Sequence, residues 1–339
     1  MTTATLLFLL VLLVITLTVA AYSTYGERKV AALLQDRIGP NRAGPLGLLQ
    51  PLADGVKMMM KEDFVPATAN RKLFFLGPAI AMITALLTGV VIPWGGTLTI
   101  GDVSFNLQGT DPEIGILYIF AMVSIGVYGI MLGGWASNNK FALLGAIRAA
   151  AQMVSYELAM ALSIVALVML TGTLSLSGIV AYQAENGWGV IHQPLGFIIF
   201  IVCAFAECNR SPFDMPECET ELVGGYHTEF SSMKLGFYLF AEYINMFMSS
   251  AVIATLYFGG YHVPGLASLG LDQNVETIIG AAAMFLKTFF FIFVFFWVRW
   301  SIPRFRFDQL MNLGWKRLIP LGVANIILTG GIYHLIKGL

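Results

Sequence analysis

Charged residues are scarce in this chain. Only 12% of its 339 residues are Asp, Glu, Lys or Arg, against roughly 25% in a soluble domain, and 57% are hydrophobic. Apolar runs of about 20 residues recur, the length that a helix needs to cross a bilayer. The short alternating segments typical of a transmembrane β-barrel are missing. The composition therefore excludes a soluble globular protein and predicts an all-α polytopic protein, with residues 1–339 forming a single integral membrane domain.

Patterns that hold metals or perform catalysis are also lacking. The chain has three cysteines with no Cys-x-x-Cys pair, and its four histidines are scattered. Zinc and iron–sulfur sites need closer sets of ligands. No nucleophile–base pattern and no phosphate-binding glycine loop is visible. We expect no bound metal or covalent cofactor, no nucleic-acid partner, and no catalytic site of the chain's own.

Eight hydrophobic segments are predicted to span the membrane. They cover approximately residues 4–24, 73–94, 114–135, 142–171, 194–209, 235–259, 277–300 and 317–336. The first is long enough to span and lacks both a preceding basic region and an Ala-x-Ala site, so we expect it to be retained. Residues 46–62 place Leu49, Leu52 and Val56 on one helical face and polar residues on another. This pattern favours an amphipathic helix at the membrane interface over an ordinary surface helix.

The placement of basic residues predicts the orientation. All Lys and Arg except Lys287 and Lys337 fall near loops on one side, chiefly residues 25–72, 207–234 and 299–317, while the opposite loops carry acids. The positive-inside rule then puts the odd-numbered loops in the cytoplasm and both termini outside. The arginines of these loops could bind lipid headgroups or an acidic partner.

One loop carries an unusual number of acids. Between the fifth and sixth predicted spans, residues 207–229 contain a single Arg210 among the acids Glu207, Asp214, Glu217, Glu219, Glu221 and Glu229. Like charges this close raise one another's pKa, as partial burial does, so such groups can load and release protons together. A plain solvated loop is the alternative.

Three further charges fall inside predicted spans, namely Glu157, Glu242 and Lys287. A charge at mid-membrane costs about 2.5–3.5 kcal/mol or more unless it faces protein or water. A static buried ion pair is one explanation. A proton path is favoured because acids crowd the adjoining loop.

Long motifs resemble one family. They are Glu27-Arg28-Lys29, Gln35-x-Arg37-x-Gly39-Pro40-Asn41-Arg42, Arg148-x-x-x-Gln152-x-x-x-Tyr156-Glu157, Asn209-Arg210-x-Pro212-Phe213-Asp214-x-Pro216-Glu217 and Arg299-x-x-x-Pro303-Arg304-x-Arg306. This pattern is similar to the H subunit, or subunit 1, of proton-pumping NADH:quinone oxidoreductase, respiratory complex I. The family's usual Pro-Glu-Ala-Glu is Pro216-Glu217-Cys218-Glu219 here, one small residue replacing another.

The resemblance implies a role at the junction of the membrane and peripheral arms. It implies a tunnel for ubiquinone or menaquinone as substrate, with Glu27, Arg28, Arg37, Asp54, Arg299 and Arg304 at or near its wall. It implies a carboxylate path to the membrane arm, to which we assign Glu157, Asp214, Glu217, Glu219, Glu221, Glu229 and Glu242, with Lys287 added from its position in a span. The implied partners are the iron–sulfur and quinone-headgroup subunits of the peripheral arm, small membrane subunits and the lipid bilayer.

Two other functions remain open on these residues. A homologous subunit of a ferredoxin-, F420- or hydrogenase-linked complex would carry similar local motifs. A free-standing ion transporter is disfavoured, because transporter sites are built from broken helices within internal repeats, and no repeat is evident. We expect the inner membrane of a bacterium, in preference to that of a mitochondrion.

Overall fold

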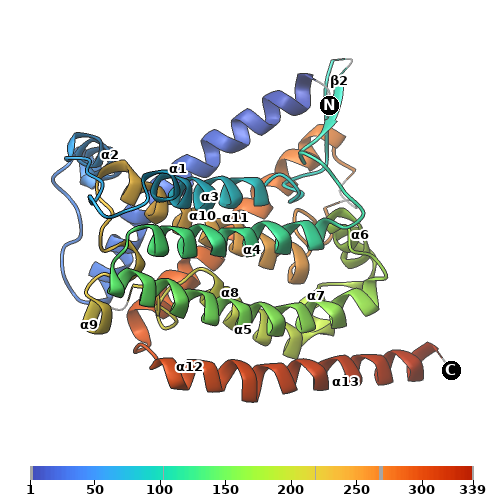
Figure 1. Ribbon diagram of the computed structural model, residues 1–339. Coiled ribbons are helices and arrows are strands. Elements are labelled where there is room, and N and C mark those ends of the chain that lie inside the picture. The colour runs from blue at the N-terminus through green and yellow to red at the C-terminus, as the bar shows by residue number, and fades with distance from the viewer. Residues whose placement is uncertain (1–2, 102, 218, 267–269, 338–339) are drawn as a thin grey trace.

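The structure is a computed structural model that describes residues 3–101, 103–217, 219–266 and 270–337, and it is predominantly helical (Figure 1). The long helices are α1 (Thr3–Leu34), α3 (Arg71–Thr88), α4 (Gly115–Ala136), α5 (Lys140–Thr171), α10 (Ser232–Tyr257), α11 (Gln273–Ser301) and α13 (Ile319–Lys337). The shorter helices are α2 (Gln50–Met60), α6 (Leu176–Asn186), α7 (Gly189–His192), α8 (Pro194–Glu207), α9 (Glu219–Leu222) and α12 (Phe307–Leu313). Single turns η1 (Pro45–Gly47), η2 (Gly225–His227) and η4 (Gly314–Leu318) complete the helical elements described here.

Seven helices of the described chain are long and apolar enough to cross a membrane. They are α1, α3, α4, α5, α10, α11 and the continuous run Phe307–Leu335, in which α12, η4 and α13 follow one another. These overlap seven of the eight predicted spans. The remaining prediction, residues 194–209, corresponds to α8, whose 14 residues rise only about 21 Å against a hydrocarbon core of about 30 Å. Eight full-length spans are therefore not confirmed.

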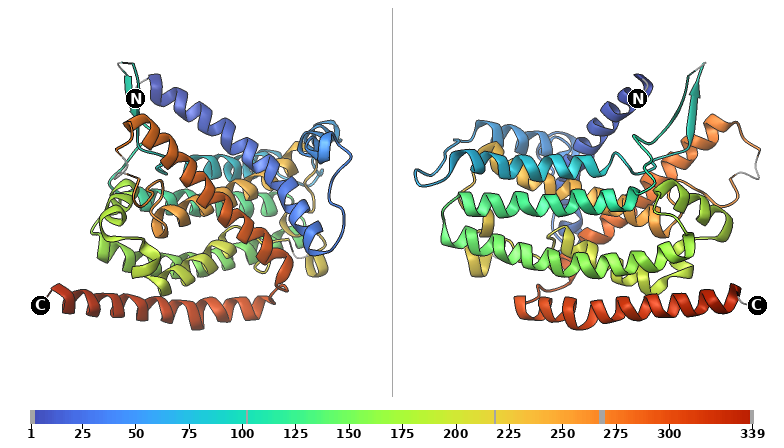
Figure 2. Two further views of the ribbon diagram at one scale, coloured as in Figure 1. Left: turned by 180° about the vertical axis from the view of Figure 1, so that it is seen from behind. Right: turned by 45° about the vertical axis from the view of Figure 1, so that its right-hand side comes forward.

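The long helices lie side by side. In Figure 1, α3, α4, α5 and α13 run in nearly the same direction as successive layers, with α10 and α11 behind them. The start of α1, the end of α13, the β-hairpin and α6 lie at one end of the molecule, and α2 and α9 lie at the other (Figure 2). The two chain ends therefore share one end of the bundle.

Close packing between α3 and α4 depends on glycine. A Cβ at Gly129 would come within 2.9 Å of the Gly77 carbonyl oxygen, and one at Gly133 within 2.0 Å of the Tyr238 hydroxyl. The Tyr238 hydroxyl donates to the Gly129 carbonyl at 2.9 Å, so α10 packs against the same surface. Small residues thus allow three helices to approach one another, as the glycine-rich spans suggest.

The prediction of an all-α chain is wrong in one detail. Strands β1 (Thr97–Ile100) and β2 (Val103–Asn106) form an antiparallel hairpin. The hairpin docks on the start of α11, where Asn274 Oδ1 accepts from the Thr99 amide and hydroxyl at 2.9 and 2.8 Å. Four alternating residues per strand are too few to distinguish a strand from a loop in the sequence.

The predicted amphipathic segment 46–62 contains a helix, α2. The helix begins four residues later than predicted, because Leu46 has a φ of 55°, which a continuous right-handed helix cannot accommodate. None of the residues of α2 is buried in the described chain. Its position at the membrane interface stays a prediction.

Candidate functional site

A cluster of buried charges forms where α1, α10, α11 and the loop after α8 meet. Arg210, in that loop, is only 5% exposed. Its Nη1 lies 3.3 Å from Glu27 Oε2 of α1, and its Nη2 lies 3.9 Å from Glu242 Oε2 of α10. The guanidinium also stacks over the Tyr243 ring, 4.1 Å from its centre. Burial alone would lower the pKa of Arg210, but Tyr243, Glu27 and Glu242 more than offset this, so the guanidinium stays charged.

Glu27 is the point where four elements are joined. Its Oε1 accepts from Arg299 Nη1 of α11 at 2.6 Å, and its Oε2 accepts from the Tyr243 hydroxyl of α10 at 2.8 Å. Together with Arg210, these contacts give a buried carboxylate two cations and a hydroxyl. Such compensation is what allows a charge to stay out of water.

A second ion pair joins the same loop to the segment after α11. Arg304 Nη2 lies 2.5 Å from Asp214 Oδ2, and the Phe305 amide donates to the Pro212 carbonyl at 3.1 Å. Burial and the nearby Glu217 nevertheless raise the pKa of Asp214 to about 7, although Arg304 and Arg210 oppose the shift. Asp214 can therefore change protonation near neutral pH.

The loop is held in place by a buried amide on α5. Gln152 Nε2 donates to the carbonyls of Ala206 and Phe213, at 2.7 and 2.8 Å, across the turn that carries Arg210. Phe213 packs between Tyr156 and Phe305, with ring centres 5.4 Å apart in both pairs. These contacts position the two charged side chains of the turn, Arg210 and Asp214.

Glu217 and Glu242 extend the cluster. The two carboxyl groups hydrogen-bond each other, and the Tyr226 hydroxyl donates to Glu242 Oε1 at 3.2 Å. His227 Nδ1 lies 3.4 Å from Glu217 Oε1 at the partly exposed edge of the cluster. Acids from α10 and from the loop thus share one site.

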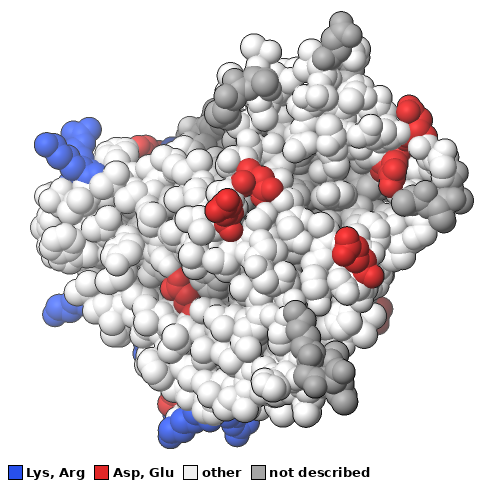
Figure 3. Space-filling view, turned by 90° about the vertical axis from the view of Figure 1, so that its right-hand side faces the viewer, with Lys and Arg blue, Asp and Glu red and all other residues white. Residues whose placement is uncertain are grey.

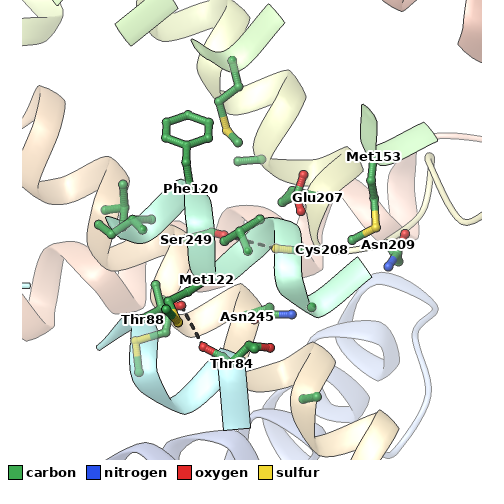
Figure 4. A pocket seen from close by; sticks show the side chains of 18 of the residues that line it. Thr84, Thr88, Phe120, Met122, Met153, Glu207, Cys208, Asn209, Asn245 and Ser249 are labelled. Carbon is green, nitrogen blue, oxygen red and sulfur yellow. Dashed lines mark hydrogen bonds between the residues drawn. The ribbon is translucent and has the colours of Figure 1, made fainter. Parts of the chain in front are cut away.

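A cavity of about 60 Å³ lies beside Glu242. Figure 4 shows Glu207, Cys208 and Asn209 together at one side of it and Thr84 and Thr88 at another. Glu207 is 5% exposed, and its Oε2 has no hydrogen-bond partner among the described residues. The volume suffices for on the order of four water molecules, at about 15 Å³ each. Hydration could therefore satisfy this orphaned oxygen.

Other predicted site residues lie outside the central cluster. Arg28 pairs with Asp54 of α2 at 2.7 Å, at a partly exposed position. Arg37 is exposed and donates to the side chain of Gln35 at 2.8 Å. Arg28 and Asp54 therefore form an outer pair between α1 and α2, apart from the inner set around Glu27.

The remaining predicted acids make separate contacts. Glu157 accepts from Ser124, Glu221 pairs with Arg148, and Glu229 accepts from Asn139 Nδ2 at 2.6 Å. The side chain of Glu219 lies outside the described residues. The acidic stretch is therefore not a uniformly solvated loop, because its described acids divide between buried and bridging positions.

Among the described residues, Lys287 makes its hydrogen bonds with the loop after α10 and not with the charged cluster. Its ammonium donates to the carbonyls of Phe258, Gly260 and His262 at 2.8, 2.7 and 2.9 Å, in the loop after α10. It also lies over the Trp188 ring. These contacts secure a loop at the end of α10 opposite to the one nearer Glu242.

The surface charges are segregated. Figure 3 shows acids on the face at the hairpin end of the molecule, with Lys and Arg only at its edges. This separation is what the positive-inside pattern predicts for two ends of a membrane bundle.

Sequence reasoning missed several members of the cluster. Arg210 and Glu207 were noticed as charges of the loop but were not assigned to the site, and Tyr226 and Tyr243 were not singled out. A lone cation among six acids was the available signal for Arg210. Among the described residues, no group of three or more His, Cys, Asp or Glu side chains could hold a metal ion.

Comparison with known proteins identifies the family of the chain. Residues 6–330 match the family described as NADH dehydrogenase. The chain is 68% identical to the H subunit numbered 1 of the NADH-quinone oxidoreductase of Cytophaga hutchinsonii, covering 93% of this chain and 92% of that protein. It is 60% identical to the H subunit of the same enzyme in Flavobacterium johnsoniae, with 96% and 93% covered, and 47% identical to NADH-quinone oxidoreductase subunit 8 of Rhodothermus marinus, with 91% of each covered. The chain therefore belongs to the family of the H subunit of NADH-quinone oxidoreductase, a membrane component of complex I.

Proposed function

We propose that this subunit forms the quinone-access tunnel of its complex and links quinone reduction to proton translocation through its buried carboxylates. The tunnel would run between the outer pair, Arg28 and Asp54, and the inner cluster around Glu27. The names of the relatives support NADH as the electron donor of the complex, in preference to ferredoxin or F420. Quinone is the substrate, and the subunit itself carries no cofactor.

One observation carries the proposal. Glu27, next to the predicted tunnel residue Arg28, shares a buried ion cluster with Glu242 and Arg210. A change of charge near Glu27 therefore changes the electrostatic environment of carboxylates of the predicted proton path, because buried charges interact strongly. Quinone reduction takes up protons and changes charge, and the cluster can respond by shifting its own protons.

The proposed setting follows from the bundle and its charges. We place the subunit in the inner membrane of a bacterium, with both termini outside and with α2, α9 and the acidic loop at the cytoplasmic end. Partners would be peripheral-arm subunits at that end and other membrane subunits along the sides. This arrangement is supported by the convergence of the three basic loops at one end of the bundle.

The test measures two activities of the assembled complex. Arg299→Ala leaves Glu27 with one cation fewer and should lower quinone reduction by about tenfold or more, since removing one partner of a buried pair is costly. Electron transfer from NADH to a soluble acceptor such as ferricyanide should persist. Arg71→Ala, an exposed arginine at the start of α3, is the matched control.

The proposed link between quinone reduction and proton translocation is tested in proteoliposomes with Glu242→Gln. Quinone reduction and proton translocation should fall together. Equal loss of both NADH activities in Arg299→Ala, or wild-type rates and proton stoichiometry in assembled Glu242→Gln, would contradict the proposal. Native gels establish assembly in each case.

A further inference from the structure

Side chains at the start of α10 contact residues 58–64, at the end of α2 and just after it. Lys234, in the first turn of α10, is 5% exposed. Its Nζ lies 2.6 Å from Asp63 Oδ1 and donates to the Phe64 carbonyl at 2.9 Å. The hydroxyls of Ser231 and Ser232 donate to the carbonyls of Glu62 and Met58, each at 3.1 Å. Three neighbouring side chains of one helix start thus hold residues 58–64.

Each of these side chains departs from what helix formation alone would favour. Ser231 occupies the N-cap position, yet its hydroxyl makes no cap and reaches Glu62 instead. Ser232 has a φ of 56°, a strained conformation for a residue with a side chain. Lys234 puts a cation at the positive end of the helix dipole. Three departures from the usual preferences of a helix start at neighbouring residues indicate a functional constraint. The feature that the three residues share is their contact with residues 58–64.

The contact with residues 63–64 compensates the buried charge of Lys234. Its ammonium lies over the rings of Phe74 and Phe75, 5.2 and 4.6 Å from their centres, and Asp63 is the carboxylate paired with it. If residues 63–64 moved away, a buried ammonium would lose both its anion and its carbonyl. Because an uncompensated buried charge is strongly unfavourable, the segment is held in place.

The helix that this contact secures lies at the surface of the described chain, between α1 and α10. The residues of α2 are not buried, and its pairing with α1 through Arg28 and Asp54 is partly exposed. Surface ion pairs of this kind contribute little to stability. The attachment at residues 58–64 is therefore one of the two anchors of α2 in the described chain, beside its contact with α1.

We propose that Ser231, Ser232 and Lys234 form a latch that positions α2 as the wall of the quinone entrance. The three are positioning residues, because they act on quinone through α2. This inference rests on the proposed function, since it assumes that α2 lines the tunnel. The latch also lies on the helix that carries Glu242 and Tyr243, so α2 and the buried cluster are attached to one rigid element.

The experiment uses the assembled complex in membranes with Lys234→Met, Asp63→Asn and the double variant. Amide hydrogen exchange of residues 50–66 should become faster. The KM for a long-chain quinone should rise by about three- to tenfold, as expected from losing one or two hydrogen bonds, while kcat changes less than about twofold. The double variant should be no worse than the poorer single one, because both remove the same contact. Lys72→Met, at an exposed lysine in the first turn of α3 and outside α2, is the control.

Ser231→Ala provides a milder variant should Lys234→Met fail to assemble, and it should give the same changes in smaller degree. Unchanged exchange in assembled variants overturns the latch. Faster exchange with an unchanged quinone KM overturns the role of the latch in positioning α2 as the wall of the quinone entrance. The proposed tunnel around Glu27 would then be judged by Arg299→Ala alone, so the two failures are distinguishable. A purely structural latch would lower the amount of complex and leave the ratio of KM to kcat unchanged.

Discussion

Arg210 shows how charge balance shapes the site. Around it the cluster holds four carboxylates, those of Glu27, Asp214, Glu217 and Glu242, and only three arginines, Arg210, Arg299 and Arg304. A fully ionised cluster would carry an excess negative charge in a poorly solvated place. Retaining about one proton removes that excess, and coupled carboxylates share such a proton.

Asp214 is the residue at which this proton is most accessible to measurement. Burial and Glu217 raise its pKa from 3.8 to about 7, so its protonated carboxyl should lose its proton with a midpoint near pH 7. Arg304→Gln should move that midpoint upward, because Arg304 stabilises the ionised form. The measurement is the infrared carbonyl band of the protonated acid, titrated from pH 5 to 9 in the purified complex.

The band must be assigned before the shift is interpreted. Asp214→Asn should remove it, while Glu185→Gln, an exposed acid at the opposite end, should leave it unchanged. A midpoint near pH 4 in the wild type would show that the ion pair dominates over burial. An unchanged midpoint in Arg304→Gln would show that Arg304 does not stabilise the ionised form of Asp214.

At the scale of elements, the sequence predicts what is long and strongly apolar. Helices α4, α5 and α11 fall within a few residues of their predicted ranges. A run of 20 apolar residues in a bilayer forms a helix because a helix satisfies all its backbone hydrogen bonds within the segment. The hairpin at residues 97–106 and helix α6 were not predicted. Both are short, and their polar contacts to distant helices decide their form.

The candidate site was predictable by residue type but not by pairing. Acids in an apolar setting stand out in a sequence, so Asp214, Glu217 and Glu242 were identified. The contact of Glu27 with Arg210 joins residues 183 positions apart, and nothing local signals it. The loop fold that brings them together depends on Gln152, whose buried amide looks ordinary in the sequence.

Lys287 is expected to stabilise the packing of α11 rather than to take part in proton transfer. Its three carbonyl contacts attach α11 to the loop after α10. Lys287→Met should destabilise the complex by about 2 kcal/mol or more, because several charge-assisted hydrogen bonds are lost together. In the assembled fraction, the proton stoichiometry should stay at the wild-type value. Native gels, thermal inactivation and proteoliposome pumping measure these effects.

The control for Lys287 is its neighbour Leu286, which is 73% exposed and faces away from this contact. Leu286→Met should assemble and pump normally. A stable Lys287→Met complex with reduced proton stoichiometry would instead show that Lys287 takes part in the proton path.

At the scale of the whole molecule, topology depends on α8. If α8 crosses the membrane despite its 14 residues, Glu185 before it and His334 in α13 lie on the same side. If it does not cross, the three later spans put them on opposite sides. The arrangement in Figure 1, with α6 and the end of α13 at one end of the bundle, favours crossing. An α8 of this length would require thinning of the bilayer or support from neighbouring helices.

We therefore expect Glu185→Cys and His334→Cys to react with a membrane-impermeant maleimide in intact spheroplasts. Lys61→Cys should react only in inverted vesicles stripped of soluble subunits, because it lies at the basic end. The background should carry Cys218→Ser, whereas Cys203 and Cys208 are buried and can remain. Labelling of Glu185→Cys and His334→Cys from opposite sides would show that α8 does not cross. Labelling of both from the cytoplasmic side would reverse the proposed orientation and place the acidic loop outside, where it could not meet a cytoplasmic peripheral arm.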